Sequence, residues 1–417
     1  MPVLQRCWLK CIDCGREYEA SERIYFCPSC GGLLDVEYEY DRRLSLTPWS
    51  KSFRERPLGV WRYRELLPIE ELDKVVTMNE GGTRLIRCGN LERDLGIREI
   101  YVKYEGDNPT GSFKDRGMTV GVTKALEVGA KTTICASTGN TRSSLAAYSA
   151  KAGLDCVVLV PSHKIALGKL SQALIHGAKV LAVKGGFDDC LSLVKEISKD
   201  PRFYLLNSIN PFRLEGQKTA AYEIYEQLGD VPDKLIIPVG NAGNIVAYWK
   251  GFRELKLLGL TEKIPNMIGV QALGASPVYK AFIEGSDKIK PMESVETVAT
   301  AIRIGNPVNW KRALRAARET GGMIGAVTDE EILWAQSILA SREGVFAEPA
   351  GAAPIAFLIK AAREGLIEPD SRVVCIVTGH GLKDPDVVLR RIEKPVEVEP
   401  EVDSVLENLS ATITEQT

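Results

Sequence analysis

The sequence predicts an α/β protein of two main domains, in which parallel sheets are covered by helices, with a small cysteine-rich module at the N-terminus. Three observations carry this prediction. Short apolar segments alternate with amphipathic ones from about residue 98 onward, which is typical of layered strands and helices. The chain has 417 residues, more than one ordinary hydrophobic core accommodates. Half of its 10 cysteines lie within the first thirty residues.

The bulk composition argues against several classes of function. Hydrophobic residues make up 45% and charged residues 26% of the chain, as in ordinary soluble proteins. A formal net charge of -2, without a long basic stripe, argues against a nucleic-acid partner. No apolar run reaches the roughly 18–20 residues of a membrane helix, and the N-terminus lacks the apolar core of a secretory signal. We therefore expect a cytoplasmic protein without a membrane partner.

Residues 1–40 are predicted to form a zinc-ribbon-like module. Two Cys-x2-Cys turns, Cys11 with Cys14 and Cys27 with Cys30, are separated by twelve residues, and glycine follows each turn. Four thiolates form the closed tetrahedral site that is typical of structural zinc, so we do not expect a catalytic metal. A hairpin without metal, or with disulfides in its place, is the alternative.

The elements beyond this module follow from the hydrophobic pattern. Most strand candidates are apolar on both sides, which is typical of parallel strands buried between helices. The strand candidates are residues 100–104, 133–136, 156–160, 179–183, 204–207, 234–239, 267–271 and 372–378. The helix candidates are residues 117–126, 141–152, 168–176, 211–228 and 244–258. Residues 286–310 lack a clear period and are expected to form a long connection lining a cleft, and residues 395–417 an exposed, irregular acidic tail.

Lys114 is the candidate catalytic residue. It lies within NPTGSFKDRG, residues 108–117, directly before a predicted helix. A lysine that attacks a carbonyl must be neutral, and burial near the positive end of a helix lowers its pKa. A single lysine at a helix start is more often a solvated ion-pair partner. Three further motifs favour the catalytic interpretation.

The first motif is a small-residue loop after the predicted strand 234–239. In such a loop, backbone N–H groups at a helix N-terminus can bind a phosphate. A glycine turn after a strand is weak evidence when it stands alone. The loop consists of Gly240, Asn241, Ala242, Gly243 and Asn244.

The other two motifs are a turn and a strand end. The turn contains Asn140 in STGN, residues 137–140, between a predicted strand and a helix. Thr378 ends the last predicted strand. Without context, Asn140 reads as a helix N-cap and Thr378 as an ordinary strand-end residue.

Together, these motifs resemble those of pyridoxal 5'-phosphate (PLP) enzymes of the tryptophan-synthase-β type, and within them the threonine synthases, over roughly residues 80–385. The resemblance implies the two-domain PLP fold of type II and a homodimer. It implies that Lys114 bonds to the cofactor and transfers protons at the substrate's α and β carbons. It also implies that residues 240–244 hold the cofactor phosphate, that Asn140 bonds the ring hydroxyl and that Thr378 faces the pyridine nitrogen.

The resemblance also implies domain bounds. Residues 107–206 are expected to form a small inner α/β domain. A large PLP domain is expected from residues 41–106 and 207–394. The active site then lies in the cleft between the two.

A second anion site is predicted for the substrate. Residues 207–219, NSINPFRLEGQKT, closely resemble threonine synthases. An arginine can bind a phosphate through two N–H groups, to which hydroxyl and amide groups add neutral donors. The resemblance implies a phosphorylated substrate, O-phospho-L-homoserine, converted with water into L-threonine and phosphate. The residues expected to bind it are Ser137, Thr138, Thr141, Asn207, Ser208 and Arg213.

Three other functions stay open at this point. A cysteate-synthase-like enzyme would use O-phosphoserine with sulfite and need a shorter phosphate pocket. A threonine or serine dehydratase would share Lys114 and the loop but would have no use for Arg213. A zinc-ribbon binding module on an inactive scaffold is disfavoured, because the lysine, both turns and Thr378 are all retained.

Overall fold

The computed structural model describes residues 6–40, 53, 55–162, 167–392 and 395–414. The chain divides into two compact units, Met1–Lys383 and Asp384–Thr417. The first unit contains three sheets, and the predicted sites all lie in it. The four-stranded sheet lies wholly within residues 107–206, as an inner domain would require, and the domain bounds themselves remain a prediction.

The largest sheet is parallel except for one edge strand. Its order is β12-β11-β10-β13-β5-β4, and β4 alone pairs antiparallel. Leu235 and Ile237 of β10 pack on one face while Ile236 packs on the other, so both faces are buried, as the apolar pattern predicts. The strands are β4 (Leu85–Arg87), β5 (Glu99–Tyr104), β10 (Lys234–Pro238), β11 (Asn266–Ala272), β12 (Met323–Val327) and β13 (Arg372–Val377).

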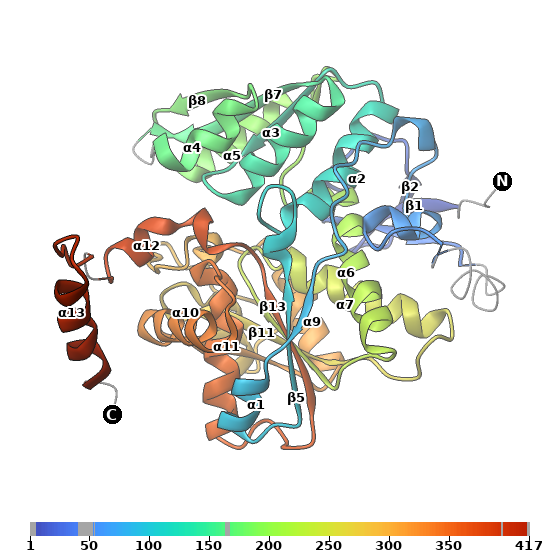
Figure 1. Ribbon diagram of the computed structural model, residues 1–417. Helices are drawn as coiled ribbons and strands as arrows, with labels where there is room; N and C mark the ends of the chain where they lie inside the picture. The colour runs from blue at the N-terminus through green and yellow to red at the C-terminus, as the bar shows by residue number, and fades with distance from the viewer. Residues whose placement is uncertain (1–5, 41–52, 54, 163–166, 393–394, 415–417) are drawn as a thin grey trace. The chain divides into compact units, whose positions relative to one another are not determined.

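Helices cover both faces of this sheet (Figure 1). One face packs against α6 (Phe212–Leu228), α7 (Gly243–Leu257), α8 (Pro277–Ile283) and α9 (Trp310–Glu319). The other packs against α1 (Gly89–Leu95), α10 (Asp329–Glu343) and α11 (Pro349–Arg363).

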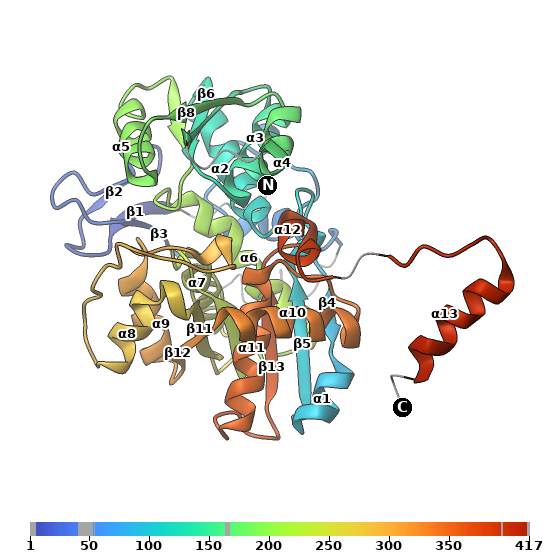
Figure 2. The same ribbon diagram turned by 90° about the vertical axis from the view of Figure 1, so that its left-hand side faces the viewer.

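The four-stranded sheet forms a second α/β layer, seen with its helices in Figure 2. Its order is β8-β7-β6-β9, and all its strands are parallel. The strands are β6 (Thr132–Ala136), β7 (Asp155–Pro161), β8 (Lys179–Val183) and β9 (Phe203–Leu205). The helices of this layer are α2 (Lys114–Glu127), α3 (Asn140–Ala152), α4 (Leu167–Ile175) and α5 (Phe187–Ile197).

The N-terminal module is a small antiparallel sheet. Its strands β1 (Cys7–Cys11), β2 (Glu17–Glu19) and β3 (Leu34–Tyr38) pair in the order β2-β1-β3. Strand β3 packs against α6 of the large layer.

The structure contains several elements that were not among those predicted. They are strands β4 and β12, helices α1, α5, α8, α9, α10 and α11, and the short α12 (Pro385–Leu389). Helix α13 (Val402–Thr414) lies in the tail, where irregular chain was expected. Between α8 and α9 the described chain contains only one short 3₁₀ turn, Thr300–Ile302, in agreement with the predicted connection. Among the described helices, none has both the length and the hydropathy needed to span a membrane.

Candidate active site

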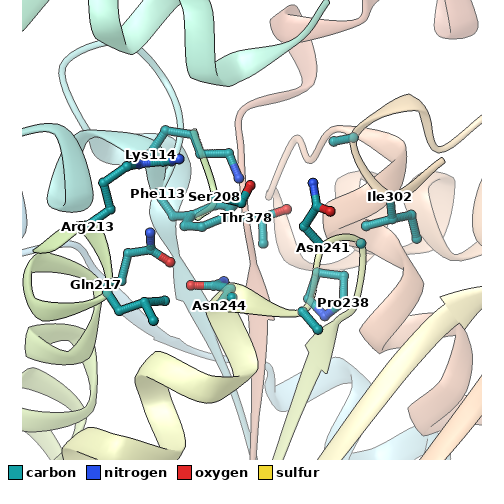
Figure 3. Close-up of a pocket in the computed structure, with 15 residues that line it drawn as sticks. Phe113, Lys114, Ser208, Arg213, Gln217, Pro238, Asn241, Asn244, Ile302 and Thr378 are labelled. Atoms are coloured by element: carbon teal, nitrogen blue, oxygen red, sulfur yellow. The ribbon is translucent and has the colours of Figure 1, made fainter. Parts of the chain in front are cut away.

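Loops at the carboxyl ends of the parallel strands meet at one pocket (Figure 3). Ligands of open α/β sheets bind at this edge, where backbone N–H groups and loop side chains are accessible. The loop after β10, the residue after β13 and the start of α2 all contribute to the pocket. The pocket is lined by Phe113, Lys114, Ser208, Arg213, Leu214, Gln217, Pro238, Gly240, Asn241, Ala242, Gly243, Asn244, Ala301, Ile302 and Thr378.

Lys114 is held beside Thr378 by the backbone. Ser112 forms an antiparallel bridge with Gly379, and the N–H of Phe113 donates to the carbonyl of Thr378 at 3.0 Å. The pKa of the Lys114 amine is lowered to about 7, chiefly by burial and then by the positive charge of Arg213. A neutral amine is therefore accessible near neutral pH, as reaction with a carbonyl requires.

Glycine residues on α2 and α6 allow the two helices to pack closely. A Cβ added at Gly216 of α6 would clash with the carbonyl oxygen of Arg116 on α2. A Cβ added at Gly117 would lie 2.8 Å from the carbonyl oxygen of Arg213. Because the helices touch through their backbones, Lys114 and Arg213 reach the same pocket from different helices.

Arg213 and Gln217 lie four residues apart on α6, so both project from one face of the helix (Figure 3). Burial lowers the pKa of the Arg213 guanidinium to about 10. Its Nε and the Oε1 of Gln217 are buried and have no hydrogen-bond partner among the described residues. Buried polar groups without partners in a pocket point to a polar ligand.

The loop after β10 has the geometry of an anion cradle. A Cβ added at Gly240 would lie 3.1 Å from the carbonyl oxygen of Ala301 and from the Cα of Ile302, so a side chain there would require the neighbouring backbone to shift. Ala242 adopts φ 63°, a strained conformation that is concentrated at ligand sites. Helix α7 begins at Gly243, and neither amide atom of Asn244 has a partner within the described chain. The backbone N–H groups at the start of α7 and the side-chain amide of Asn244 can donate to an anion, which fits the cofactor phosphate.

Glu348 connects two of the predicted cofactor residues. Asn140 donates its Nδ2 hydrogen to Glu348 at 2.8 Å, and Thr378 donates its hydroxyl to the other carboxylate oxygen at 3.0 Å. Burial raises the pKa of Glu348. Sequence reasoning missed this residue. The available signal was an acidic residue directly before the apolar helix Pro349–Arg363.

The predicted substrate residues divide into two groups. Ser208 and Arg213 line the pocket, as expected. The amide of Asn207 instead bonds the backbone N–H and carbonyl of Ala136 at 3.0 and 2.8 Å, and it ties the segment after β9 to β6. The other residues that do not line the pocket are Ser137, Thr138 and Thr141, in and after the turn that follows β6.

Sequence reasoning also missed Gln217. Its signal was the spacing of four residues from Arg213 within the predicted helix 211–228, which places both residues on one helix face.

The four predicted cysteine ligands come together in the N-terminal module. Their Sγ atoms all lie within 4.8 Å of one another, with Cys11 and Cys30 at 3.4 Å and Cys14 and Cys27 at 3.6 Å. A tetrahedral zinc with Zn–S bonds of about 2.3 Å requires sulfur separations near 3.8 Å. The cluster therefore fits a four-thiolate metal site.

Comparison with known proteins supports the predicted family. The family described as pyridoxal-phosphate dependent enzymes matches residues 76–379. The threonine synthase of Methanocaldococcus jannaschii is 56% identical over 94% of this chain and 96% of that protein. Threonine synthases of Methanosarcina acetivorans (55%, over 96% and 98%) and Mycobacterium tuberculosis (52%, over 81% and 92%) are also similar.

Solved structures confirm the predicted fold. Threonine deaminase isoform 2 of Solanum lycopersicum has a TM-score of 0.65 at 21% identity and covers 81% of this chain and 95% of its own. Maize serine racemase has a TM-score of 0.62 at 18% identity, over 74% and 91%. The chain therefore belongs to the pyridoxal-phosphate dependent enzymes and, within them, to the threonine synthase family.

Proposed function

We propose that this protein is a PLP-dependent threonine synthase, which converts O-phospho-L-homoserine and water into L-threonine and phosphate. The observation that carries the proposal is a second anion position beside Lys114. Arg213 is buried there on α6, apart from the loop of residues 240–244 that would hold the cofactor phosphate. An enzyme that acts on unphosphorylated serine or threonine would not require the buried guanidinium of Arg213 to bind its substrate.

The residues that would hold PLP are those predicted from the sequence. Lys114 would bond to its aldehyde, and residues 240–244 would bind its phosphate. Asn140 and Thr378 would approach the ring, and Glu348, which bonds both, would keep their side chains oriented. When bound, PLP supplies an electron-accepting ring that stabilises negative charge beside the amino group.

The reaction assigns distinct tasks to the pocket residues. Once the amino group of the substrate has replaced it on the cofactor, Lys114 would be a free amine. In its neutral form it would take the proton from Cα of the substrate and then move protons at Cβ. Arg213 and Ser208 bind the phosphate group while the bond between Cγ and oxygen breaks. Phosphate leaves with that oxygen, and Cγ gains a proton to become the methyl group. A water molecule supplies the hydroxyl of threonine at Cβ, and Cα regains its proton.

Gln217 extends the proposed phosphate site. It shares a helix face with Arg213. Its Nε2 could donate to a phosphate oxygen, and its Oε1, which has no partner among the described residues, could accept from the guanidinium when the substrate is bound. An additional contact of this kind fixes the orientation of the arginine.

The proposal also includes the metal and the setting of the enzyme. We propose that Cys11, Cys14, Cys27 and Cys30 bind one structural zinc ion. The cytoplasmic location, the homodimer and the lack of nucleic-acid or membrane partners remain predictions from the sequence.

Product analysis in water enriched in ¹⁸O tests the proposed reaction. The holoenzyme should release equal amounts of threonine and phosphate from O-phospho-L-homoserine, with the label in the threonine hydroxyl. Homoserine together with labelled phosphate would indicate a phosphatase and contradict the proposal. Faster turnover of O-phosphoserine with sulfite, or of unphosphorylated threonine, would favour the cysteate-synthase-like or the dehydratase alternative.

A further inference from the structure

The segment 205–215 carries Ser208 and Arg213 into the pocket, and its opposite side contacts the N-terminal module. Tyr25 of the module is buried, and its hydroxyl oxygen accepts a hydrogen bond from the N–H of Leu205 at 2.8 Å. The ring of Tyr25 also meets that of Tyr204 edge-on, with centroids 5.9 Å apart. The start of the segment is therefore fixed to the module where it leaves β9.

Apolar contacts continue along the same side of the segment. Tyr25 and Leu33 of the module pack in one cluster with Leu205 and Ile209. Further along, Phe212, the residue before Arg213, packs in a second cluster. The module residues in that cluster are Leu9, Cys11, Cys27, Leu34, Val36 and Tyr38. Two of the proposed metal ligands thus lie in the cluster that contains the neighbour of Arg213.

The end of the segment is held by a buried charge cluster. Tyr38 of β3 donates its hydroxyl to Glu215 at 2.6 Å. Glu215 is fully buried and also pairs with Lys218 at 2.7 Å and with Lys250 at 2.6 Å. Lys250 in turn contacts Asp35 of the module at 3.1 Å. Because Glu215 is two residues from Arg213 on α6, this cluster restrains the turn of helix that carries the guanidinium.

We propose that the four-cysteine module positions the phosphate-binding segment 205–215 of the active site, with Tyr25 and Tyr38 as positioning residues. This inference rests on the proposed function, in which Ser208 and Arg213 bind the substrate phosphate. The module bonds to Leu205 and Glu215 and shares hydrophobic clusters with Ile209 and Phe212, while Ser208 and Arg213 line the pocket. Anchoring one side of a short segment at successive points fixes the direction of the side chains on the other side.

Binding of inorganic phosphate to the holoenzyme tests the inference. The cofactor phosphate occupies the loop of residues 240–244, so added phosphate reports on the site at Arg213. Tyr25→Phe and Tyr38→Phe should each raise the Kd for phosphate, and the KM for O-phospho-L-homoserine, by about 3-fold to 10-fold. The absorbance of the lysine-bound cofactor and kcat should stay unchanged, because the hydrogen bonds of Tyr25 and Tyr38 go to Leu205 and Glu215 and not to Lys114 or the loop.

Two control variants separate positioning from simple loss of stability. Lys10→Ala alters an exposed pair with Glu17 on the module and should leave the phosphate Kd unchanged. Ile355→Val lowers stability in the core around α11 without touching the segment, and it should also leave the Kd unchanged. Unchanged phosphate Kd values in both tyrosine variants would overturn the inference.

Arg213→Ala distinguishes this inference from the proposed function. If the wild-type enzyme binds phosphate and Arg213→Ala does not, the proposed phosphate site stands, whatever the tyrosine variants do. If Arg213→Ala binds phosphate as the wild type does, the proposed site fails and the inference fails with it.

Hydrogen–deuterium exchange keeps the inference testable even where a variant does not fold. In the wild-type holoenzyme, inorganic phosphate should slow exchange both in the segment 205–215 and in β1 and β3 of the module. Protection confined to the segment would contradict the proposed coupling.

Discussion

At the residue scale, the pocket brings two basic side chains together, Lys114 and the buried Arg213. Burial lowers the pKa of Lys114 most, the charge of Arg213 lowers it further, and the carboxylate of Glu348 opposes these effects. One positive group thus serves two purposes, since it attracts a phosphate and favours the neutral form of the amine. The contacts of Asn207 with Ala136 and of Glu348 with Asn140 could not be predicted from the sequence, because each joins residues more than sixty positions apart. The place of Gln217 in the pocket depends on how α6 packs.

Lys114→Ala should abolish turnover and remove the visible absorbance of the lysine-bound cofactor. The fold should persist, because the backbone contacts around Phe113 do not involve the amine. Circular dichroism and the absorbance spectrum of the purified variant check both points. Full activity in this variant would contradict the assignment of Lys114 as the catalytic residue.

The reactivity of Lys114 should follow its lowered pKa. In the cofactor-free protein, acylation of this amine should reach half its maximum rate near pH 7, because the protonated form that dominates below this pH is unreactive. Arg213→Ala should move the midpoint to higher pH, since the Arg213 charge disfavours the protonated amine. Mass spectrometry of the Lys114 peptide across a pH series measures the midpoint. A midpoint near 10 in the wild type would contradict the burial argument.

At the scale of elements, the crossing of α2 over α6 fixes the distance between Lys114 and Arg213. The sequence predicts both helices from their patterns, but the close crossing depends on glycines whose partners are distant in sequence. Strand β12 was missed for a similar reason. Its Gly325 weakens the strand pattern, and a Cβ there would collide with Phe357 of α11.

Gly216→Ala should disrupt this crossing. The added methyl group would clash with the carbonyl of Arg116, and we expect a loss of about 1–3 kcal/mol in the free energy of unfolding, together with a higher KM for the phosphorylated substrate. Gly89→Ala is the matched control, because a Cβ there has no atom within 4 Å. Denaturant unfolding of both variants checks the difference, and equal stability of the two would refute the close contact.

At the scale of the whole molecule, the alternating apolar pattern predicts the parallel layers because it depends on local sequence alone. The loops after β10 and β13 converge because the carboxyl ends of parallel strands lie at one edge of the sheet. The residues in those loops were predicted from their motifs and the family resemblance. The contacts between the N-terminal module and the segment 205–215 were not predicted, because they join residues about 180 positions apart.

Zinc should be present at one ion per chain in freshly purified, reduced protein, with the four cysteines as its ligands. Removal of the zinc by a chelator should lower the midpoint temperature of thermal unfolding and weaken phosphate binding. The kcat at saturating substrate should stay largely unchanged. Metal analysis and differential scanning calorimetry provide the readouts. Protein without zinc would refute the metal assignment, and a loss of kcat alone would refute a structural role.

The central claim is that Arg213 binds the substrate phosphate beside Lys114. The most direct test compares the activities of Arg213→Ala on phosphorylated and on unphosphorylated substrates. Contacts to a charged group contribute about 1.5–3 kcal/mol, so kcat/KM for O-phospho-L-homoserine should fall by about 10-fold to over 100-fold. The cofactor should stay bound, and any slow reaction of unphosphorylated serine or threonine should be much less affected. Equal losses of kcat/KM on phosphorylated and unphosphorylated substrates would mean that Arg213 supports the fold and does not bind the substrate phosphate.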